Sequence, residues 1–303
     1  MYNNQDIIDI CHKIKPTGCI TCGEWELIKN GIETNINTEL VNNENDADYV
    51  IYHGRNSWGW SKDFVNESKI KNPDKAIIID YHDSPNHVFS DDAKYYFKRS
   101  LVDKTLNKVN KYNRNIYHIP YCVRPDFLKY TIDKKTNDER NIDVGIYFDT
   151  NNNHIVNRNR VKVAKFINNS KKLSKYNIHV GLVSQHGKEW RHFVNDKYIN
   201  KLIDSKIIVT CNPSLWEGDY RLYEALISGA VVFVDEMKFK DGFADNENIC
   251  FYDLNNLESL ESKLIYYLSN SELLIKSMNK NIENTMTNHL SKNLIDRILK
   301  VIK

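Results

Sequence analysis

Residues 213–235 contain the pattern that most constrains the fold of this chain: a polar loop, a short helix, a glycine stop and a buried strand. Asp219 is a suitable N-cap residue, and apolar side chains follow at i, i+3 and i+4 spacing from Leu222, which predicts an inward-packed helix. Gly229 stands where a helix C-terminus favours a left-handed residue, and residues 230–234 are apolar, as in a buried parallel strand. A helix that leads directly into such a strand indicates an α/β fold.

Two charged side chains of this predicted helix suit an anionic ligand. Arg221 and Glu224 are three residues apart, so both project from neighbouring positions on one side of the helix. Free N–H groups and the dipole at a helix start favour a phosphate, and an arginine adds a forked, permanently charged donor. Glu224 offers an acceptor for sugar hydroxyls. The alternative is an ordinary amphipathic helix with a solvated Arg–Glu pair.

The stretch Asp219-x-Arg221-x-x-Glu224-Ala-Leu-x-x-Gly229-Ala resembles the donor-binding signature of GT-B glycosyltransferases, in their exostosin-like and group 1 branches. The resemblance implies an α/β protein with two Rossmann-like domains, whose parallel sheets face a cleft, and a C-terminal cross-over helix. It also implies that Glu224 holds the donor ribose, Arg221 the phosphates, and Glu217 the donor sugar or the loop. In the group 1 pattern seven residues separate the two glutamates, whereas six separate Glu217 from Glu224 in this chain.

A basic pair upstream extends the expected donor site. Residues 141–148 read as the first strand of the same domain, and in GT-B enzymes the loop after that strand often contributes a basic residue to the diphosphate. Arg158 and Arg160 are the candidates here, although arginine at a helix start is also common on protein surfaces. The full expected donor-binding set is Ser214, Glu217, Gly218, Asp219, Tyr220, Arg221, Glu224, Arg158 and Arg160.

The N-terminal half reads as a second α/β unit. Strands are predicted at residues 48–53, 75–80 and 115–120, and a helix at residues 89–106. Functional loops of such units follow the carboxyl ends of their parallel strands. We therefore predict a site in the loops that follow the first two of these strands.

The resemblance implies that this N-terminal unit binds the acceptor and supplies the base of an inverting reaction. Asp83 is the first candidate for the catalytic base and His82 the second, because burial in a closed cleft raises a carboxyl pKa. Asp83-Ser-Pro is also a common turn sequence. The expected acceptor surface contains Arg55, Trp58 and Trp60.

The expected organisation is an N-terminal acceptor-binding domain at residues 1–135 and a nucleotide-sugar-binding domain at residues 141–285. The charged stretch between them is the best linker candidate. Residues 286–303 read as an amphipathic helix, which the resemblance would return toward the first domain.

Composition limits the partners. The 303 residues carry 42 basic and 40 acidic side chains, a net charge of +2, and a general nucleic-acid binder would normally carry a larger, clustered excess. Residues 1–16 lack the apolar core of a signal peptide, and no apolar run reaches the length of a membrane span. We therefore expect a soluble, cytoplasmic protein with no membrane span and no nucleic-acid partner. Cys19-Ile-Thr-Cys22 lacks a second ligand pair at zinc spacing.

A metal site is not expected. Asp46-Ala-Asp48 matches the Asp-x-Asp of metal-dependent GT-A transferases, but it precedes its strand, so its carboxylates would lie at the wrong edge of the sheet. The sequence thus predicts no metal and no cofactor other than a nucleoside diphosphate sugar as co-substrate.

The predicted reaction transfers a sugar from a nucleoside diphosphate sugar to a hydroxyl of a glycan or protein-linked glycan. One rival is a catalytically silent relative that serves as a carbohydrate-binding or scaffold subunit. A Rossmann-type oxidoreductase or epimerase is a weaker rival, because the chain has no Gly-x-Gly-x-x-Gly.

Overall fold

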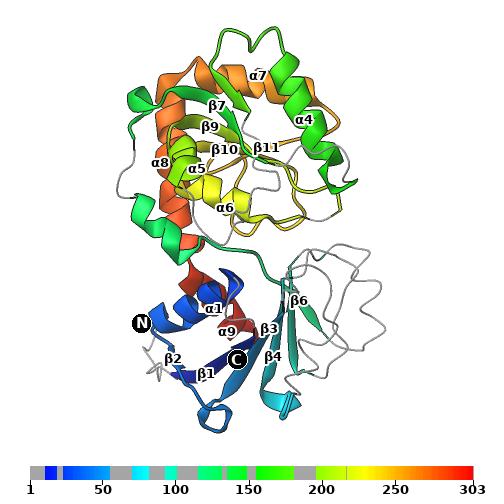
Figure 1. Cartoon of the computed structure of the whole chain (residues 1–303), viewed down its shortest axis with the longest axis vertical. Coiled ribbons are helices and arrows are strands. Elements are labelled where there is room, and N and C mark those ends of the chain that lie inside the picture. Colours follow the sequence, from blue (N-terminus) through cyan, green and yellow to red (C-terminus); the bar gives the residue numbers. More distant parts are fainter. Residues whose placement is uncertain are drawn as a thin grey trace, which may run out of the picture.

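The computed structural model describes residues 11–18, 23–54, 70–81, 93–99, 101, 115–131, 135–148, 155–180, 196–215 and 217–302. The described strands form two parallel sheets, which occupy opposite halves of the molecule (Figure 1). The first half contains β1 His12–Gly18, α1 Gly23–Thr34, β2 Thr38–Leu40, β3 Tyr49–Gly54, β4 Ala76–Asp80, β5 Tyr95–Lys98 and β6 Ile116–His118. The second contains β7 Ile142–Ile146, α4 Arg158–Asn169, β8 Ile178–Val180, α5 Asp196–Ile203, β9 Ser205–Val209, α6 Tyr220–Ile227, β10 Val231–Asp235, β11 Cys250–Tyr252, α7 Leu257–Leu268 and α8 Ser271–Asn288. The last helix, α9 Ser291–Ile302, follows α8 and lies in the first half.

The first sheet has the strand order β2-β1-β3-β4-β5-β6, and every pair is parallel. Its central strand β4 is buried along its whole length, as expected where both faces of a parallel sheet are covered. Ile77 and Ile79 point into the core beneath α1 and α9, whereas Ala76 and Ile78 point to a separate apolar cluster on the other face. This two-residue period holds the sheet between two apolar layers.

The second sheet has the order β11-β10-β9-β7-β8 and is also parallel. Alternate side chains of β9 also point to opposite faces of the sheet. Ile208 packs with residues of α5 and α6, and Ile207 and Val209 pack with residues of α4 and α7. Helices therefore cover both faces, and this α/β arrangement confirms the fold class predicted from the strand and helix pattern.

The helix predicted at residues 89–106 is wrong over the part that the structure describes. Tyr95–Lys98 is strand β5, which pairs with β4 on one side and β6 on the other. Phe97 faces the main core and Tyr96 the opposite cluster, so aromatic side chains that also fit a helical period follow a strand period here. Neither β1 nor α1 was predicted, because polar residues separate their buried positions.

The C-terminal helix begins later than predicted. Helix α8 continues to Asn288, His289 ends it, and α9 begins at Ser291. Figure 1 shows α9 (red) beside α1 (blue), and its apolar face joins the core of the first half through Leu294, Ile295, Ile298, Leu299 and Ile302. Polar bonds fix this contact: Asn35 Nδ2 donates to Asp296 Oδ1 at 2.7 Å, and the hydroxyls of Tyr49 and Tyr95 donate to the Ile302 carbonyl oxygen at 3.4 and 3.3 Å.

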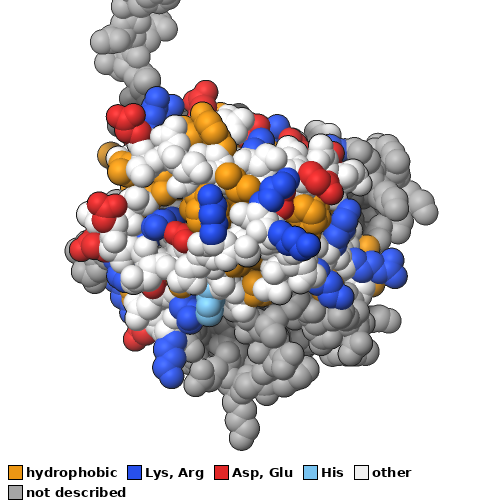
Figure 2. Space-filling view, turned by 90° about the horizontal axis from the view of Figure 1, so that it is seen from above, with side chains coloured by type: hydrophobic (Ala, Val, Ile, Leu, Met, Phe, Trp, Pro, Cys, Tyr) orange, Lys and Arg blue, Asp and Glu red, His pale blue; other side chains and the backbone are white. Residues whose placement is uncertain are grey.

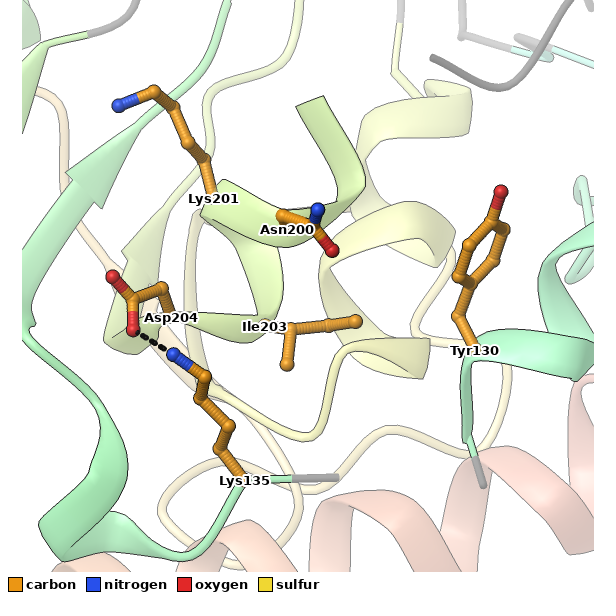
Figure 3. A pocket seen from close by; sticks show the side chains of 6 residues that line it. All are labelled: Tyr130, Lys135, Asn200, Lys201, Ile203 and Asp204. Atoms are coloured by element: carbon orange, nitrogen blue, oxygen red, sulfur yellow. Dashed lines mark hydrogen bonds and ion pairs between the residues drawn. The ribbon is translucent and has the colours of Figure 1, made fainter. Parts of the chain in front are cut away.

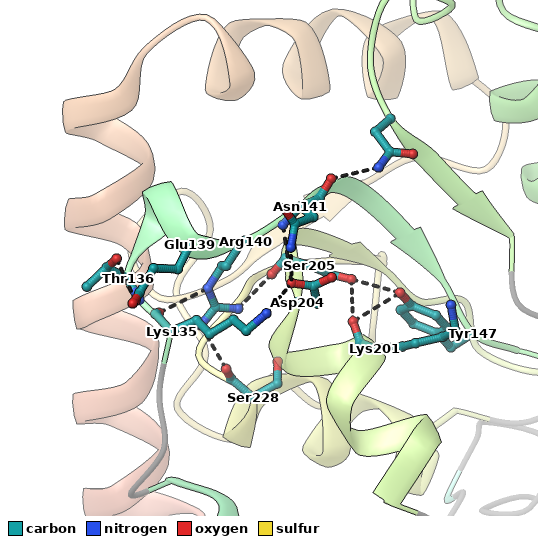
Figure 4. Close-up of polar contacts among 11 residues, drawn as sticks. Lys135, Thr136, Glu139, Arg140, Asn141, Tyr147, Lys201, Asp204, Ser205 and Ser228 are labelled. Carbon is teal, nitrogen blue, oxygen red and sulfur yellow. Dashed lines mark hydrogen bonds and ion pairs between the residues drawn. The ribbon is translucent and has the colours of Figure 1, made fainter.

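The segment between the two sheets is bound to the second one by Arg140 (Figure 4). Its guanidinium is buried and donates to the carbonyl oxygens of Lys135, Ser205 and Ser228, at 3.3, 2.7 and 3.0 Å. Burial lowers the pKa of Arg140 to about 10. Because Ser228 ends α6, this cation also lies at the negative end of that helix.

Substituting Gly31 by alanine should destabilise the protein, although alanine is the better helix former. A Cβ at this position of α1 would lie 2.5 Å from the Ser291 carbonyl oxygen and 2.8 Å from Ile295 Cγ1, so α1 and α9 would have to separate. Overpacking of this kind costs about 1–3 kcal/mol. Urea unfolding of Gly31→Ala, with the exposed Glu33→Ala as control, measures the loss; an unchanged or raised midpoint would contradict the close packing.

The protein should lose stability between pH 6.5 and pH 4 through His289. Its ring is buried and stacks on Phe243, with ring centroids 4.3 Å apart. Burial, and secondarily Arg297, lowers the pKa of His289 to about 4, with Asp241 acting in the opposite direction. Because the unfolded chain takes up this proton at a higher pH than the folded chain, the contribution of His289 is complete above pH 6.5 and falls by about 3 kcal/mol as the pH drops to 4. Between pH 6.5 and 4 the free energy of unfolding should fall less in His289→Gln than in the wild type, as measured by urea denaturation at several pH values. An equal fall in the two proteins would refute the assignment.

Candidate functional site

The carboxyl ends of the two sheets meet at the middle of the molecule. In the first half, Tyr81 follows β4 and Arg99 follows β5. In the second half, the loop after β9 leads to Gly218 and the start of α6. Arg99 is 1% exposed, and its guanidinium donates to the carbonyl oxygens of both Tyr81 and Gly218. Ligands of parallel α/β sheets bind at this edge, so the junction is the candidate site.

Stacked tyrosine rings connect the two halves at this edge. Tyr121 stacks on Tyr81 at 4.9 Å and on Tyr220 at 3.7 Å between centroids, and the Arg99 guanidinium lies 4.7 Å from the centre of the Tyr121 ring. Tyr220 is the first residue of α6. The start of the helix that carries the sequence signature is therefore packed directly against the first half.

Asp219 is shared by two buried arginines. Its Oδ2 accepts hydrogen bonds from Arg221 Nη1, at 2.8 Å, and from Arg160 Nη2. Arg160 also donates to the Cys211 carbonyl oxygen at 2.9 Å, and Arg221 to the Tyr147 carbonyl oxygen at 3.2 Å. The two guanidinium groups thus share one hydrogen-bonded carboxylate at the positive end of α6, and the buried Asp235 carboxylate also acts electrostatically on Arg160.

Asp219 occupies the N-cap position of α6, but its side chain does not cap the helix. The predicted N-cap is therefore right in position and wrong in its hydrogen bond. The carboxylate turns to the two arginines, because a charged pair in a buried setting outweighs one bond to a backbone N–H.

Gly218 is held in a left-handed conformation, with φ of +77°. Its N–H donates to Asn212 Oδ1 at 2.9 Å. Asn212 is fixed in turn by Asp235 at the end of β10, whose Oδ1 accepts from the Asn212 backbone N–H at 2.6 Å and from its side-chain amide at 3.2 Å. Burial raises the pKa of Asp235 to about 6. The carboxyl ends of β9 and β10 thus fix the loop before α6.

Glu217 binds a neighbouring loop. Its carboxylate accepts hydrogen bonds from the backbone N–H groups of Lys238 and Phe239, at 2.7 and 3.0 Å, and burial raises its pKa. Glu217 therefore binds the loop after β10, and its expected contact with the donor sugar stays a prediction. Glu224 is half-buried one turn into α6, and its Oε2 accepts from the Tyr198 hydroxyl at 2.5 Å.

Ser214 and Arg158 lie at the start of α4. The Ser214 hydroxyl accepts from the Asn159 N–H at 3.1 Å, and its own N–H donates to the Val156 carbonyl oxygen at 2.8 Å. Arg158 is exposed, in contrast to the buried Arg160. The expected donor residues therefore come together at one edge of the second sheet, with Arg158 at the rim.

The remaining expected site residues lie outside the described part of the chain. These are the catalytic candidates His82 and Asp83 and the acceptor candidates Arg55, Trp58 and Trp60. Their roles stay predictions.

A charged group that the sequence did not indicate joins the halves beside the site. His118, at the end of β6, forms a 2.9 Å contact from Nε2 to Asp241 Oδ2, and its ring stacks on Phe239 at 4.0 Å. Arg297 of α9 donates to Asp241 Oδ1 at 2.7 Å. The position of His118 at the carboxyl end of a strand was the available signal, whereas Asp241 and Arg297 are brought there by the fold.

A cavity of about 480 Å³ lies at the opposite edge of the second sheet (Figure 3). Tyr130 stands on one side and the 2.6 Å ion pair between Lys135 and Asp204 on the other, with Ile203 between them. Asp204 directly precedes β9, so this cavity is at the amino ends of the strands. It is separate from the donor-motif residues.

Among the described residues, no three His, Cys, Asp or Glu side chains come together in a way that could hold a metal ion. Asp48 Oδ2 accepts from the Lys13 N–H at 2.8 Å, at the amino end of β3. No helix in the described ranges combines the length and apolarity needed to cross a membrane.

Comparison with known proteins identifies the architecture. Residues 158–300 match the family model described as "Glycosyl transferase-like". An alpha-glucosyltransferase in complex with UDP-glucose and DNA containing an abasic site is 13% identical, with a TM-score of 0.65 over 97% of this chain and 99% of that one. A glycosyltransferase from Rickettsia africae ESF-5 is 12% identical, with a TM-score of 0.56 over 97% and 98% of the two chains.

Staphylococcus aureus TarM, in complex with Fondaparinux, alpha-GlcNAc-glycerol and UDP, is 16% identical with a TM-score of 0.51, covering 84% of this chain and 56% of TarM. No curated protein sequence gives a significant match. At these identities the structural likeness establishes the fold that these proteins share.

Replacing Asp219 by asparagine should strongly destabilise the protein, because two buried guanidinium groups lose their counter-charge. Removal of one partner from a buried ion pair costs about 3–5 kcal/mol. The control is Asp126→Asn, which breaks the partly exposed pair with Arg124 and should cost about 1 kcal/mol or less. Urea unfolding measures the free energy of unfolding of both variants. If Asp219→Asn loses no more stability than Asp126→Asn, the two arginines do not depend on the Asp219 carboxylate.

Proposed function

We propose that this chain, which has the GT-B fold and a glycosyl transferase-like domain at residues 158–300, transfers a sugar from a nucleoside diphosphate sugar to an acceptor hydroxyl. The observation that carries the proposal is the Asp219 carboxylate shared by Arg160 and Arg221 at the start of α6. It places two buried guanidinium groups at the carboxyl edge of a parallel sheet, where a diphosphate would be bound.

Arginine supplies what a departing nucleoside diphosphate requires. As the bond from the sugar to the diphosphate breaks, negative charge builds up on the phosphate oxygens, and fixed positive groups stabilise that charge in the transition state. Arg160 and Arg221 are preorganised for this task because carbonyl oxygens and Asp219 already hold them. The positive end of the α6 dipole adds to this stabilisation, and no side-chain cap of Asp219 offsets it. On this basis we propose that catalysis is metal-independent.

Glu224 is the proposed ribose ligand. It lies one turn into α6 from Arg221, at i, i+3 spacing, so a nucleotide whose phosphates meet the helix start would bring its ribose alongside. The Tyr198 hydroxyl holds one carboxylate oxygen and orients the group. Hydrogen bonds from sugar hydroxyls to a carboxylate are worth about 1.5–3 kcal/mol each.

The first half is the proposed acceptor side. Its carboxyl edge lies against Gly218 and Tyr220 through Arg99 and Tyr121, so an acceptor bound at this edge would face the proposed donor residues. Asp83, with His82 as second candidate, remains the proposed base. The acceptor expected from the sequence is a glycan. Of the solved structures described above, that of the alpha-glucosyltransferase contains DNA and that of TarM contains Fondaparinux.

UDP and UDP-glucose should raise the thermal unfolding midpoint of the wild-type protein, equally with and without EDTA. A ligand at about 100 times its Kd stabilises by roughly 2.7 kcal/mol.

Glu224→Gln should weaken UDP binding by about 10- to 100-fold through the lost ribose contacts, whereas the exposed Glu283→Gln should bind as the wild type does. In a sugar-release assay, Asp83→Asn should lower kcat while leaving the UDP midpoint shift unchanged.

Each alternative has its own outcome. If other nucleoside diphosphates raise the unfolding midpoint and UDP does not, the donor site is supported, but the nucleobase of the donor is not uracil. A shift that EDTA abolishes would refute metal independence. If no nucleotide shifts the midpoint, the silent scaffold replaces the enzyme as the better description.

A further inference from the structure

The positive charge of this chain is concentrated in one segment. Between Asp149 and Glu189 the sequence contains eight Lys and Arg residues and no Asp or Glu. Because the whole chain has 42 basic and 40 acidic residues, the remainder carries fewer basic than acidic side chains. A near-neutral total therefore conceals a strongly asymmetric charge distribution.

The structure places much of this charge on one outer face of α4. Arg158, Lys162 and Lys165 follow at i, i+4 and i+7 and are all exposed, so they form a stripe along the helix. The opposite face, with Val163 and Ile167, is buried against the second sheet. A solvated helix face usually mixes charges of both signs, whereas this one carries a single sign.

Beyond the end of α4 the basic surface continues through the turn before β8. Lys171 and Lys175 are exposed there, and Lys172 forms a 2.8 Å ion pair with Glu261 of α7. Figure 2, which looks onto the end of the molecule that holds α4 and α7, shows several Lys and Arg side chains on this face together with Asp and Glu side chains. We call the surface formed by Arg158, Lys162, Lys165, Lys171 and Lys175 the basic ridge.

The basic ridge is largely free of counter-charges within the described part of the chain. Lys162 donates to the Leu254 carbonyl oxygen at 2.7 Å, and no described carboxylate forms an ion pair with Arg158, Lys165 or Lys171. On the neighbouring α7, Glu261 is bound to Lys172 and Ser170, and Glu258 acts on the same Lys172. A ridge of unpaired cations attracts an extended anion.

The basic ridge begins at the donor site. Arg158 is two residues before the buried Arg160, and the Asn159 N–H is bound by Ser214 of the donor loop. From there α4 runs for 12 residues, about 18 Å, to the turn that holds Lys171. A polymer lying along the ridge would therefore extend from the mouth of the site across the outer surface.

We infer that the basic ridge binds the phosphate backbone of a double-stranded nucleic acid; this binding does not depend on the proposed function. Lysine is a point-charge ligand of phosphates and reads no base sequence. Single strands are bound by aromatic rings that stack on bases, and Phe166 and Tyr176, the aromatic residues of the described ridge segment, are half-buried. A convex, lysine-rich ridge suits the regular backbone of a duplex.

The salt dependence of duplex binding tests the inference. The probe is a fluorescein-labelled 20-base-pair DNA, titrated by anisotropy at salt concentrations between 50 and 200 mM. The triple variant Lys165→Gln, Lys171→Gln, Lys175→Gln should bind more weakly than the wild type, and its slope of log Kd against log salt should fall by about 1 per lysine removed. The control is Lys276→Gln, Lys280→Gln, Lys300→Gln, which removes the same charge from exposed positions of α8 and α9 and should keep the wild-type slope.

Three outcomes would overturn the inference: no duplex binding by the wild type at 50 mM salt, equal losses in the two triple variants, or tighter binding of a polysulfated glycan such as heparin than of the duplex. UDP-induced thermal shifts measured on the same samples separate the two proposals. A normal UDP shift without duplex binding refutes the basic ridge alone, and a missing UDP shift with ridge-dependent duplex binding refutes the donor assignment alone.

Discussion

The arrangement of the candidate site depends on one carboxylate between two arginines. Asp219 binds Arg160 from α4 and Arg221 from α6, so it fixes the starts of two helices that lie on opposite faces of the second sheet. The same carboxylate that fixes the two helix starts also holds the two buried guanidinium groups that we propose as ligands of the diphosphate.

The two halves of the molecule are joined at functional positions. Arg99 and Tyr121 follow strands of the first sheet and His118 ends one. Arg99 contacts Gly218 in the loop before α6, Tyr121 contacts the first residue of α6, and His118 contacts the loop after β10. Helix α9 continues from the second half and packs on α1, and its Arg297 reaches Asp241 in the loop after β10. Gly218 and Tyr220 are themselves part of the contact between the halves. A change in the position of one half relative to the other would therefore displace these two residues directly.

Total charge proved to be a poor guide to the surface of this protein. The balance of 42 basic and 40 acidic residues led to the expectation of no nucleic-acid partner, yet the residues between Asp149 and Glu189 carry one sign of charge. Folding then orders these side chains further, since the amphipathic period of α4 buries its apolar residues and leaves Arg158, Lys162 and Lys165 on one exposed stripe. The electrostatic field depends on this local arrangement and not on the sum.

The sequence by itself determined the α/β class and the helix–glycine–strand order around α6, because buried parallel strands and N-caps have strong local signatures. It also indicated the two arginines that meet at Asp219. It did not determine that Tyr95–Lys98 is a strand, since a short aromatic run fits either period until neighbouring strands supply hydrogen bonds. Nor could it show that Asp219 binds arginines in place of capping its helix, or that Glu217 holds the loop at Lys238. Those choices depend on which groups the tertiary structure brings within a few ångströms and removes from water, and only the folded chain decides that.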